Sequence, residues 1–122
     1  MKYMLLTYLD EKAWAARDED DRQRTMDAAK PHVLDLPASR KFLGGAPLSP
    51  TSTAATVKLS GGKRLITDGP FAETREQLGG YTLIEASSQE EAVELASGFL
   101  GSCSPATIEV RRILEVPGVP SH

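Results

Sequence analysis

The amino-acid sequence predicts an α+β fold in which two helices pack on one face of an antiparallel sheet. Three kinds of pattern support this prediction. Several segments alternate apolar and polar side chains with a period of two, which is typical of strands. Two segments carry apolar residues three and four positions apart, as on one helical face. The turn sequence Ser60-Gly61-Gly62-Lys63 joins two of the strand-like segments as a hairpin.

Composition fits such a fold and disfavours several classes of function. The 122 residues suffice for a single domain, residues 1–122, and the apolar share of 40% is ordinary for a globular protein. A formal charge of −3 disfavours nucleic acid, whose binders usually carry a basic face. No run approaches the ~20 apolar residues that span a bilayer. The single cysteine, Cys103, suits a reducing compartment, so we expect a cytoplasmic protein with no membrane or nucleic-acid partner.

Residues 2–9 are predicted to form a strand that is apolar on both faces. Tyr3 and Leu5 point to one side of this strand, whereas Met4 and Leu6 point to the other. A strand of this kind belongs in the middle of a sheet that is covered on both faces. The prediction therefore requires a covering layer on each side of the sheet.

A helix is predicted after the polar connection at residues 10–21, with Asp18 or Asp20 as its N-cap. The apolar residues on one face of this helix are Met26, Ala29, Val33 and Leu36. Pro31 lies inside the pattern, and a proline in a helix interior removes a hydrogen bond and clashes with the preceding turn. We therefore expect a kink or break near residues 27–31.

The second half of the chain supplies more strands and a second helix. The strands expected here lie near residues 41–48, 55–60, 64–67, 81–86 and 106–114. The segment at residues 55–60 alternates apolar and polar side chains and is expected to be half-buried. A helix begins at a capping box of Ser87 and Glu90 and ends at Gly101. This order of elements gives a ferredoxin-like layout.

A ferredoxin-like subunit leaves one face of its sheet bare. Here that face is apolar in the first strand, and in the strand at residues 81–86 Tyr81 and Leu83 compete with Ile84 and Ala86 for burial. An exposed apolar sheet face favours a partner. We therefore expect a homodimer in which two sheets close face to face, with a cavity between them.

The stretch from Thr67 to Ala86 is the most distinctive part of the sequence. Asp68-Gly69-Pro70 is a strong turn signal, because glycine can take positive φ and aspartate can hydrogen-bond the amides that follow it. Gly79-Gly80 permits the close approach of another backbone or a ligand. With its tetrad Asp68-Gly69-Pro70-Phe71, this stretch resembles the YCII-related family, in the branch that carries an Asp-Gly-Pro-Phe motif.

The resemblance extends from Lys2-Tyr3-Met4-Leu5-Leu6 to Ile108-Glu109-Val110-Arg111. It implies a ferredoxin-like subunit and a dimeric α+β barrel with a cleft at the sheet faces. In one branch of the family a His-Asp pair in that cleft is proposed to be catalytic; its histidine would fall near Ala29 here, and the nearest histidine is His32. Genes of the Asp-Gly-Pro-Phe branch often neighbour those of extracytoplasmic-function sigma factors, which implies a regulatory alternative.

Asp68 is the first candidate for catalysis, because a carboxylate at a strand end beside a cleft can act as a general base. The alternative is a turn residue that only accepts amide hydrogen bonds. His32 is the candidate acid–base partner, since histidine titrates near neutrality. Its position directly after Pro31 also suits a surface or interface residue.

The candidate ligand-binding residues are Glu73, Arg75, Tyr81 and Arg111. Glu73 and Arg75 can bind a polar ligand at the mouth of the cleft or can belong to a solvated loop. Either Arg111 or Arg112 faces the cleft, and the strand register decides which. Tyr81 lines the cleft or packs at the dimer face.

No metal or cofactor is expected, because two histidines and one cysteine far apart in sequence form no recognisable ligand set. We expect a homodimer whose cleft binds a small organic molecule, with proton transfer or hydrolysis as its chemistry if it is an enzyme. The alternative is a non-catalytic accessory protein that docks on a sigma factor.

Overall fold

The computed structural model describes residues 1–34, 41–100 and 106–121. The strands in these ranges are β1 (Lys2–Leu9), β2 (Phe42–Pro47), β3 (Ala55–Ser60), β4 (Lys63–Asp68), β5 (Gln77–Glu85) and β6 (Ala106–Arg112). The helices are α1 (Glu11–Ala16), α2 (Glu19–Leu34) and α3 (Gln89–Leu100), with a short 3-10 turn, η2 (Thr51–Thr53), before β3. None of the helices in the described ranges is long and apolar enough to cross a bilayer.

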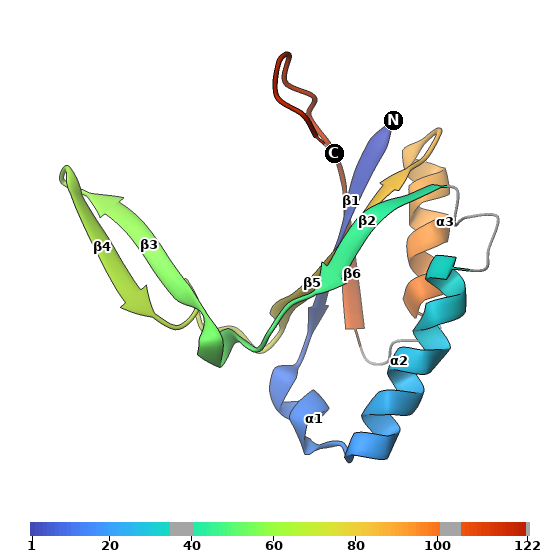
Figure 1. Ribbon diagram of the computed structural model, residues 1–122, viewed down its shortest axis with the longest axis horizontal. Coiled ribbons are helices and arrows are strands. Elements are labelled where there is room, and N and C mark those ends of the chain that lie inside the picture. The colour runs from blue at the N-terminus through green and yellow to red at the C-terminus, as the bar shows by residue number, and fades with distance from the viewer. Residues whose placement is uncertain (35–40, 101–105, 122) are drawn as a thin grey trace.

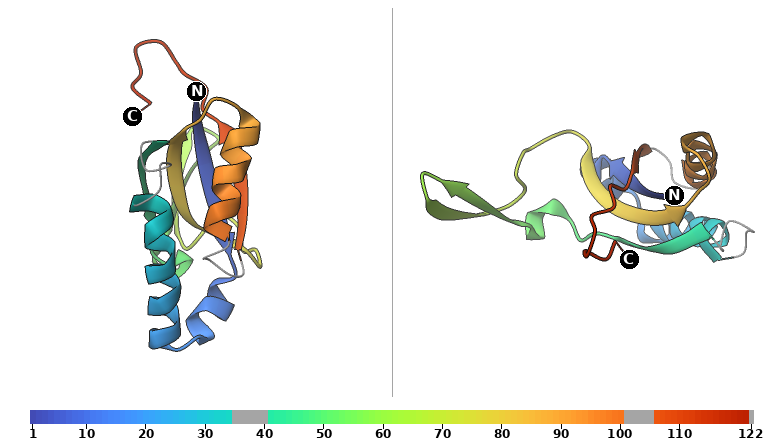
Figure 2. Two further views of the ribbon diagram at one scale, coloured as in Figure 1. Left: turned by 90° about the vertical axis from the view of Figure 1, so that its right-hand side faces the viewer. Right: turned by 90° about the horizontal axis from the view of Figure 1, so that it is seen from above.

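Four strands form the main sheet in the order β2-β5-β1-β6, and every neighbouring pair is antiparallel. Helices α2 and α3 both lie on the same side of this sheet (Figure 1). Viewed from the helix side in Figure 2, α3 runs in front of the strands and α2 lies beside it. This arrangement confirms the predicted ferredoxin-like α+β fold.

The core lies between the main sheet and α3. Its buried residues are Tyr3, Leu5, Ile84, Ala86, Ala92 and Ala96. The strand register explains this set, because Tyr3 is paired with Ile84 in β5, and directly paired residues share a face of the sheet. Ala92 and Ala96 are small, which allows the backbone of α3 to approach the strands closely.

Strands β3 and β4 form a separate two-stranded sheet, which we call the β3–β4 arm (residues 55–68). The arm projects away from the main sheet on the side opposite to α2 and α3 (Figures 1 and 2). The predicted hairpin turn is confirmed, with φ of 56° at Gly61 and 78° at Gly62. The predicted half-burial of residues 55–60 is wrong, because no layer of the described chain covers the arm: Val57 is 66% exposed and Leu59 75%.

The start of α2 agrees with the sequence. The backbone N–H of Asp21 donates to Asp18 Oδ1 over 2.7 Å, so Asp18 is the N-cap. The predicted break near residues 27–31 is wrong, since α2 runs through Pro31 to Leu34. A proline removes one hydrogen bond of the helix, and the turns on either side keep this 16-residue helix continuous. The predicted helical position of Leu36 lies outside the described residues.

The start of α3 is one residue later than predicted. The backbone N–H of Glu91 donates to Ser88 Oγ over 3.1 Å, so Ser88 rather than Ser87 is the N-cap. The Ser87 hydroxyl instead donates to the Glu91 carboxylate over 2.8 Å. Two adjacent serines offer the same capping chemistry, and the backbone path selects the second of them.

Strand β5 begins at Gln77, four residues before the predicted start, because Gly79 and Gly80 belong to the strand. The register of β1 and β5 shifts at Gly79, between the pairs that Thr7 and Tyr8 make. A Cβ atom on Gly79 would lie 2.5 Å from Leu9 Cδ2. A Cβ atom on Gly80 would lie 3.2 Å from the Ala46 carbonyl oxygen of β2. The close approach predicted for this glycine pair is therefore made by the two strands that flank β5.

Candidate functional site

The face of the main sheet turned away from α3 carries apolar side chains, and we call it the open face. The register pairs Met4 with Leu83 and Leu6 with Tyr81, so all four side chains point to this face. Tyr81 is 40% exposed, whereas Leu83 is only 6% exposed. The register also places Tyr8 and the exposed Glu109, which is paired with Leu6, on this face. The open face therefore combines apolar side chains with phenol groups and a carboxylate.

The register also decides between the two arginines at the end of β6. Arg111 is paired with Met4 and belongs to the open face, while Arg112 is paired with Tyr3 and belongs to the helix side. Arg111 is exposed, so its guanidinium is accessible on the same face as Tyr81. A phenol, a guanidinium and the Glu109 carboxylate beside apolar side chains suit a small organic molecule with polar groups.

Asp68 ends β4 at the base of the arm, directly opposite Ala55. The turn that follows is closed by backbone atoms: Gly69 takes a φ of 95°, and its N–H donates to the Ala54 carbonyl oxygen over 2.7 Å. The Thr56 hydroxyl donates to the Gly69 carbonyl oxygen over 2.9 Å. Within the described part of the chain, the exposed Asp68 carboxylate accepts no hydrogen bond. It is therefore available to a ligand.

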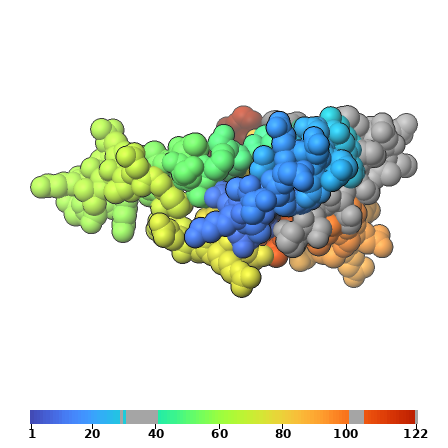
Figure 3. Space-filling model, turned by 90° about the horizontal axis from the view of Figure 1, so that it is seen from below, coloured from blue at the N-terminus to red at the C-terminus, as the bar shows by residue number. Residues whose placement is uncertain are grey.

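The loop between β4 and β5 is held against the body by weak polar contacts. Arg75 Nε lies 3.9 Å from Asp10 Oδ2, and the Arg75 side chain is 92% exposed. The Thr107 hydroxyl donates to the Glu76 carboxylate over 3.3 Å. Glu73 is exposed. In Figure 3 this loop, drawn in yellow, lies beside the arm and next to the N-terminal segment drawn in blue.

A contact that sequence reasoning missed fixes the base of the arm. The Glu11 carboxylate accepts hydrogen bonds from the Thr51 backbone N–H, at 3.0 Å, and from the Thr51 hydroxyl, at 2.7 Å. It thereby ties α1 to the 3-10 turn that precedes β3. The two residues are 40 positions apart, so no local pattern could have indicated their contact.

The candidate residues do not form one cluster. Tyr81 and Arg111 share the open face, while Asp68, Glu73 and Arg75 lie around the arm and the loop that follows it. His32 belongs to α2, and its side chain lies outside the described part of the structure. Two shallow hollows lie at the other end of the sheet, lined mainly by Met1, Lys2 and the segment after β6, and neither reaches Asp68 or Tyr81.

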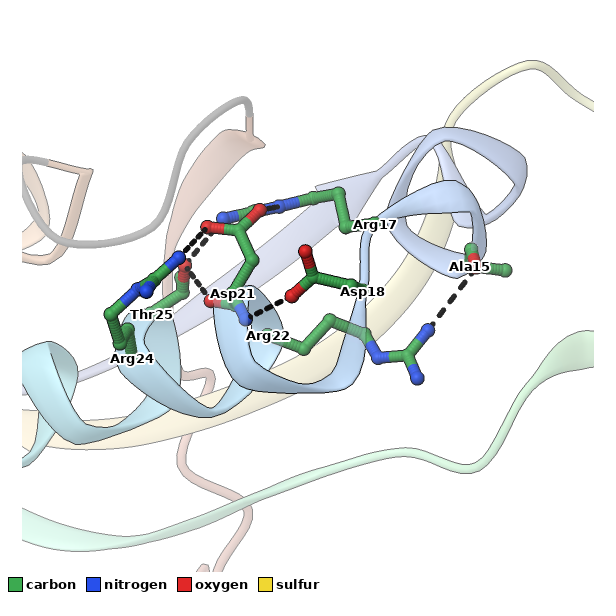
Figure 4. Close-up of polar contacts among 7 residues, drawn as sticks. All are labelled: Ala15, Arg17, Asp18, Asp21, Arg22, Arg24 and Thr25. Atoms are coloured by element: carbon green, nitrogen blue, oxygen red, sulfur yellow. Dashed lines mark hydrogen bonds and ion pairs between the residues drawn. The ribbon is translucent and has the colours of Figure 1, made fainter.

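Asp21, the last residue of the acidic run at residues 18–21, forms ion pairs at the corner between α1 and α2 (Figure 4). Arg17 Nε donates to Asp21 Oδ2 over 2.6 Å, and Arg24 lies 3.5 Å from the same carboxylate. The hydrogen bond from Arg17 lowers the pKa of Asp21 below its ordinary value. The guanidinium of Arg17 also lies 5.0 Å from the centre of the Trp14 ring. Asp21 is thus paired with two arginines, which indicates a structural role for this residue.

No three His, Cys, Asp or Glu side chains of the described ranges lie close enough together to hold a metal ion. Asp68 is one of the exposed carboxylates, but a single carboxylate supplies too few ligands for a metal site.

The sheet order, the two helices on one side and the open apolar face define a small ferredoxin-like α+β subunit. The chain matches the YCII-related domain over residues 1–116. It is also 37% identical, over 124 aligned residues, to an uncharacterized protein of Rhizobium meliloti (strain 1021), and the alignment spans 97% of each chain. The protein therefore belongs to the YCII-related family.

Proposed function

We propose that this protein is a cytoplasmic homodimer that binds a small organic molecule in a cleft between two open faces. The observation that carries the proposal is the apolar surface around Tyr81, which no helix of the described chain covers. An apolar sheet face of this kind needs a partner to exclude water. A second copy supplies an identical face, and twofold symmetry is the usual way in which such faces pair.

Each copy would contribute several kinds of chemical group to the lining of the cleft. Tyr81 and Arg111 come from the open face and would orient the ligand through a phenol and a guanidinium. Glu73 and Arg75 would contact polar parts of the ligand at the mouth of the cleft. The tetrad Asp68-Gly69-Pro70-Phe71 supports placing the protein in the Asp-Gly-Pro-Phe branch.

Asp68 is the group that would carry out chemistry if the ligand is turned over. Its carboxylate has no hydrogen-bond partner in the described residues, so it can accept a proton from a bound molecule. Proton transfer or hydrolysis suits a carboxylate of this kind. His32 is the candidate acid–base partner, because its imidazole changes charge near neutral pH.

A screen of a metabolite library by thermal shift tests this proposal, with wild type and Asp68→Asn measured in parallel. A ligand at 100 times its Kd stabilises the folded state by about 2.7 kcal/mol, which raises the Tm measurably. We expect a ligand whose shift is lost in Asp68→Asn and kept in Glu94→Gln, which removes an exposed carboxylate from α3. A ligand that raises the Tm of wild type and of both variants equally would show that it binds away from Asp68.

A second candidate function is favoured by the exposed apolar side chains beyond the open face. Phe71 is 84% exposed and Ile66 58%, so a protein surface could also be bound there. In this case the protein is a non-catalytic accessory of an extracytoplasmic-function sigma factor. Sedimentation velocity of the purified protein mixed with such a sigma factor from its own host should show a complex that sediments faster than either protein alone. If the two proteins sediment at the same rates in the mixture as they do separately, this function is excluded.

A further inference from the structure

The β3–β4 arm has two faces of different chemistry. Directly paired residues of an antiparallel hairpin share a face, so the register sorts its side chains without ambiguity. One face, here called the apolar arm face, carries Ala55, Val57, Leu59, Arg64, Ile66 and Asp68. The other face carries Thr56, Lys58, Ser60, Lys63, Leu65 and Thr67. The apolar arm face thus has a row of three large aliphatic side chains that ends at Asp68.

This row is exposed in the single chain. Val57, Leu59 and Ile66 are 66%, 75% and 58% exposed, and all three lie on a hairpin with only two strands. An isolated two-stranded hairpin is marginally stable in water, and a third strand or a packed surface is needed to stabilise it. The described part of the chain supplies neither, so the covering surface has to come from another molecule.

The direction of the arm indicates which molecule this is. The arm leaves the main sheet on the side of the open face, opposite to α2 and α3 (Figures 1 and 2). A second copy that docks on the open face would therefore lie alongside the arm. The Glu11–Thr51 contact ties the turn that precedes β3 to α1, close to the base of the arm.

Charge favours the same partner. The arm has a formal charge of +2, from the basic residues Lys58, Lys63 and Arg64 and the acidic residue Asp68. Because the whole chain has a formal charge of −3, the rest of the chain carries −5. Two arms would repel each other, while an arm and the body of another copy attract. This difference in net charge favours contact between an arm and the body of a second copy over contact between two arms.

We infer that the β3–β4 arm packs against the body of a second copy through its apolar arm face, and that this contact encloses Asp68 between the two subunits. The inference rests on the proposed face-to-face homodimer and adds that the site is incomplete in one chain. Asp68 shares a face with Val57 and Ile66, so a surface that covers this row also excludes water from the carboxylate. Each site would then combine Asp68 of one copy with residues of its partner.

Two matched substitutions test this inference. Leu59→Asp places a carboxylate on the apolar arm face, opposite Arg64, and Leu65→Asp places one on the other face, opposite Lys58. Each new carboxylate meets a basic partner across the hairpin, so both variants are expected to keep the arm folded. Sedimentation equilibrium should show a dimer Kd at least tenfold weaker for Leu59→Asp, and a change of about twofold or less for Leu65→Asp.

A third variant separates the inference from the proposal on which it rests. Leu6→Asp introduces a charge into the open face, opposite Tyr81, and should abolish the dimer. If Leu6→Asp dissociates the dimer while Leu59→Asp leaves its Kd unchanged, the open face pairs without the arm and the inference fails alone. If wild type is a monomer at all concentrations, both fail.

Hydrogen exchange of wild type gives a second readout that does not depend on a variant. The amides of β3 and β4 should exchange more slowly as the protein concentration rises through the dimer Kd. Exchange in the arm that is independent of concentration would overturn the inference. Slowing that appears only with an added sigma factor would also overturn it and would favour the accessory function.

Discussion

The main sheet and the β3–β4 arm carry the same sequence pattern and differ in what covers it. In β5, Ile84 is 3% exposed because α3 packs over it. In the arm, Leu59 is 75% exposed although it follows the same alternation of apolar and polar side chains. The alternation of apolar and polar residues therefore predicts which side chains share a face of a strand. It does not predict whether that face is buried, because burial requires another part of the structure to pack over it.

The largest effect that we expect in this comparison is the loss of a covered side chain from the main sheet. Leu5→Ala removes a side chain that is 1% exposed in the centre of the core. The lost packing and the cavity left behind should lower the free energy of unfolding by about 2–5 kcal/mol. Chemical denaturation measures this change. Leu114→Ala is the control, because Leu114 is 85% exposed and its truncation should change stability by less than about 0.5 kcal/mol. Equal losses would contradict the assignment of the core.

An intermediate effect is expected where two strands of the main sheet approach closely. A Cβ atom on Gly45 would lie 2.5 Å from the Tyr81 carbonyl oxygen, whereas one on Gly79 would lie 2.5 Å from the end of the Leu9 side chain. Backbone cannot move aside as a side chain can, so Gly45→Ala should destabilise by about 1–3 kcal/mol and Gly79→Ala by less. Thermal unfolding of both variants shows which substitution destabilises the protein more. A larger loss for Gly79→Ala would show that the backbone of the edge strand β2 moves aside more easily than the Leu9 side chain.

The smallest effect is expected at the corner between α1 and α2, where Arg17 and Asp21 form a half-buried ion pair. Arg17 holds the pKa of Asp21 below its ordinary value of 3.8. Since the folded pKa is the lower one, the stabilisation is complete above the unfolded pKa and is lost as the pH falls through the folded value. The difference in unfolding free energy between wild type and Asp21→Asn should therefore stay constant from neutral pH to about pH 5 and shrink below about pH 4. A difference that grows in acid would contradict the pairing.

Much of the fold could be predicted from local signals. The hairpin turn follows from Gly61-Gly62, and the N-cap of α2 follows from a side chain that bonds an amide three residues on. The start of β5 differs from the prediction because Gly79-Gly80 resembles a loop in sequence, and the pairing of this segment with β1 and β2 makes it part of a strand. The exposure of the arm was missed for a related reason, since burial is a property of contacts between distant segments.

The candidate site could be predicted less completely. The sequence places Asp68 at a strand end, and the structure agrees because the turn signal is local. The choice of Arg111 over Arg112 required the register of β1 and β6, which no single segment encodes. The contact between Glu11 and Thr51 joins segments far apart in the chain and had no local signal at all.

The measurement that tests the account most directly is the mass of wild type in solution, determined by sedimentation equilibrium across a range of concentrations. A second copy of the chain would cover both the open face and the β3–β4 arm. The account predicts a species of twice the chain mass of 13.2 kDa, which dissociates on dilution. A mass of 13.2 kDa that persists at the highest concentration would contradict it.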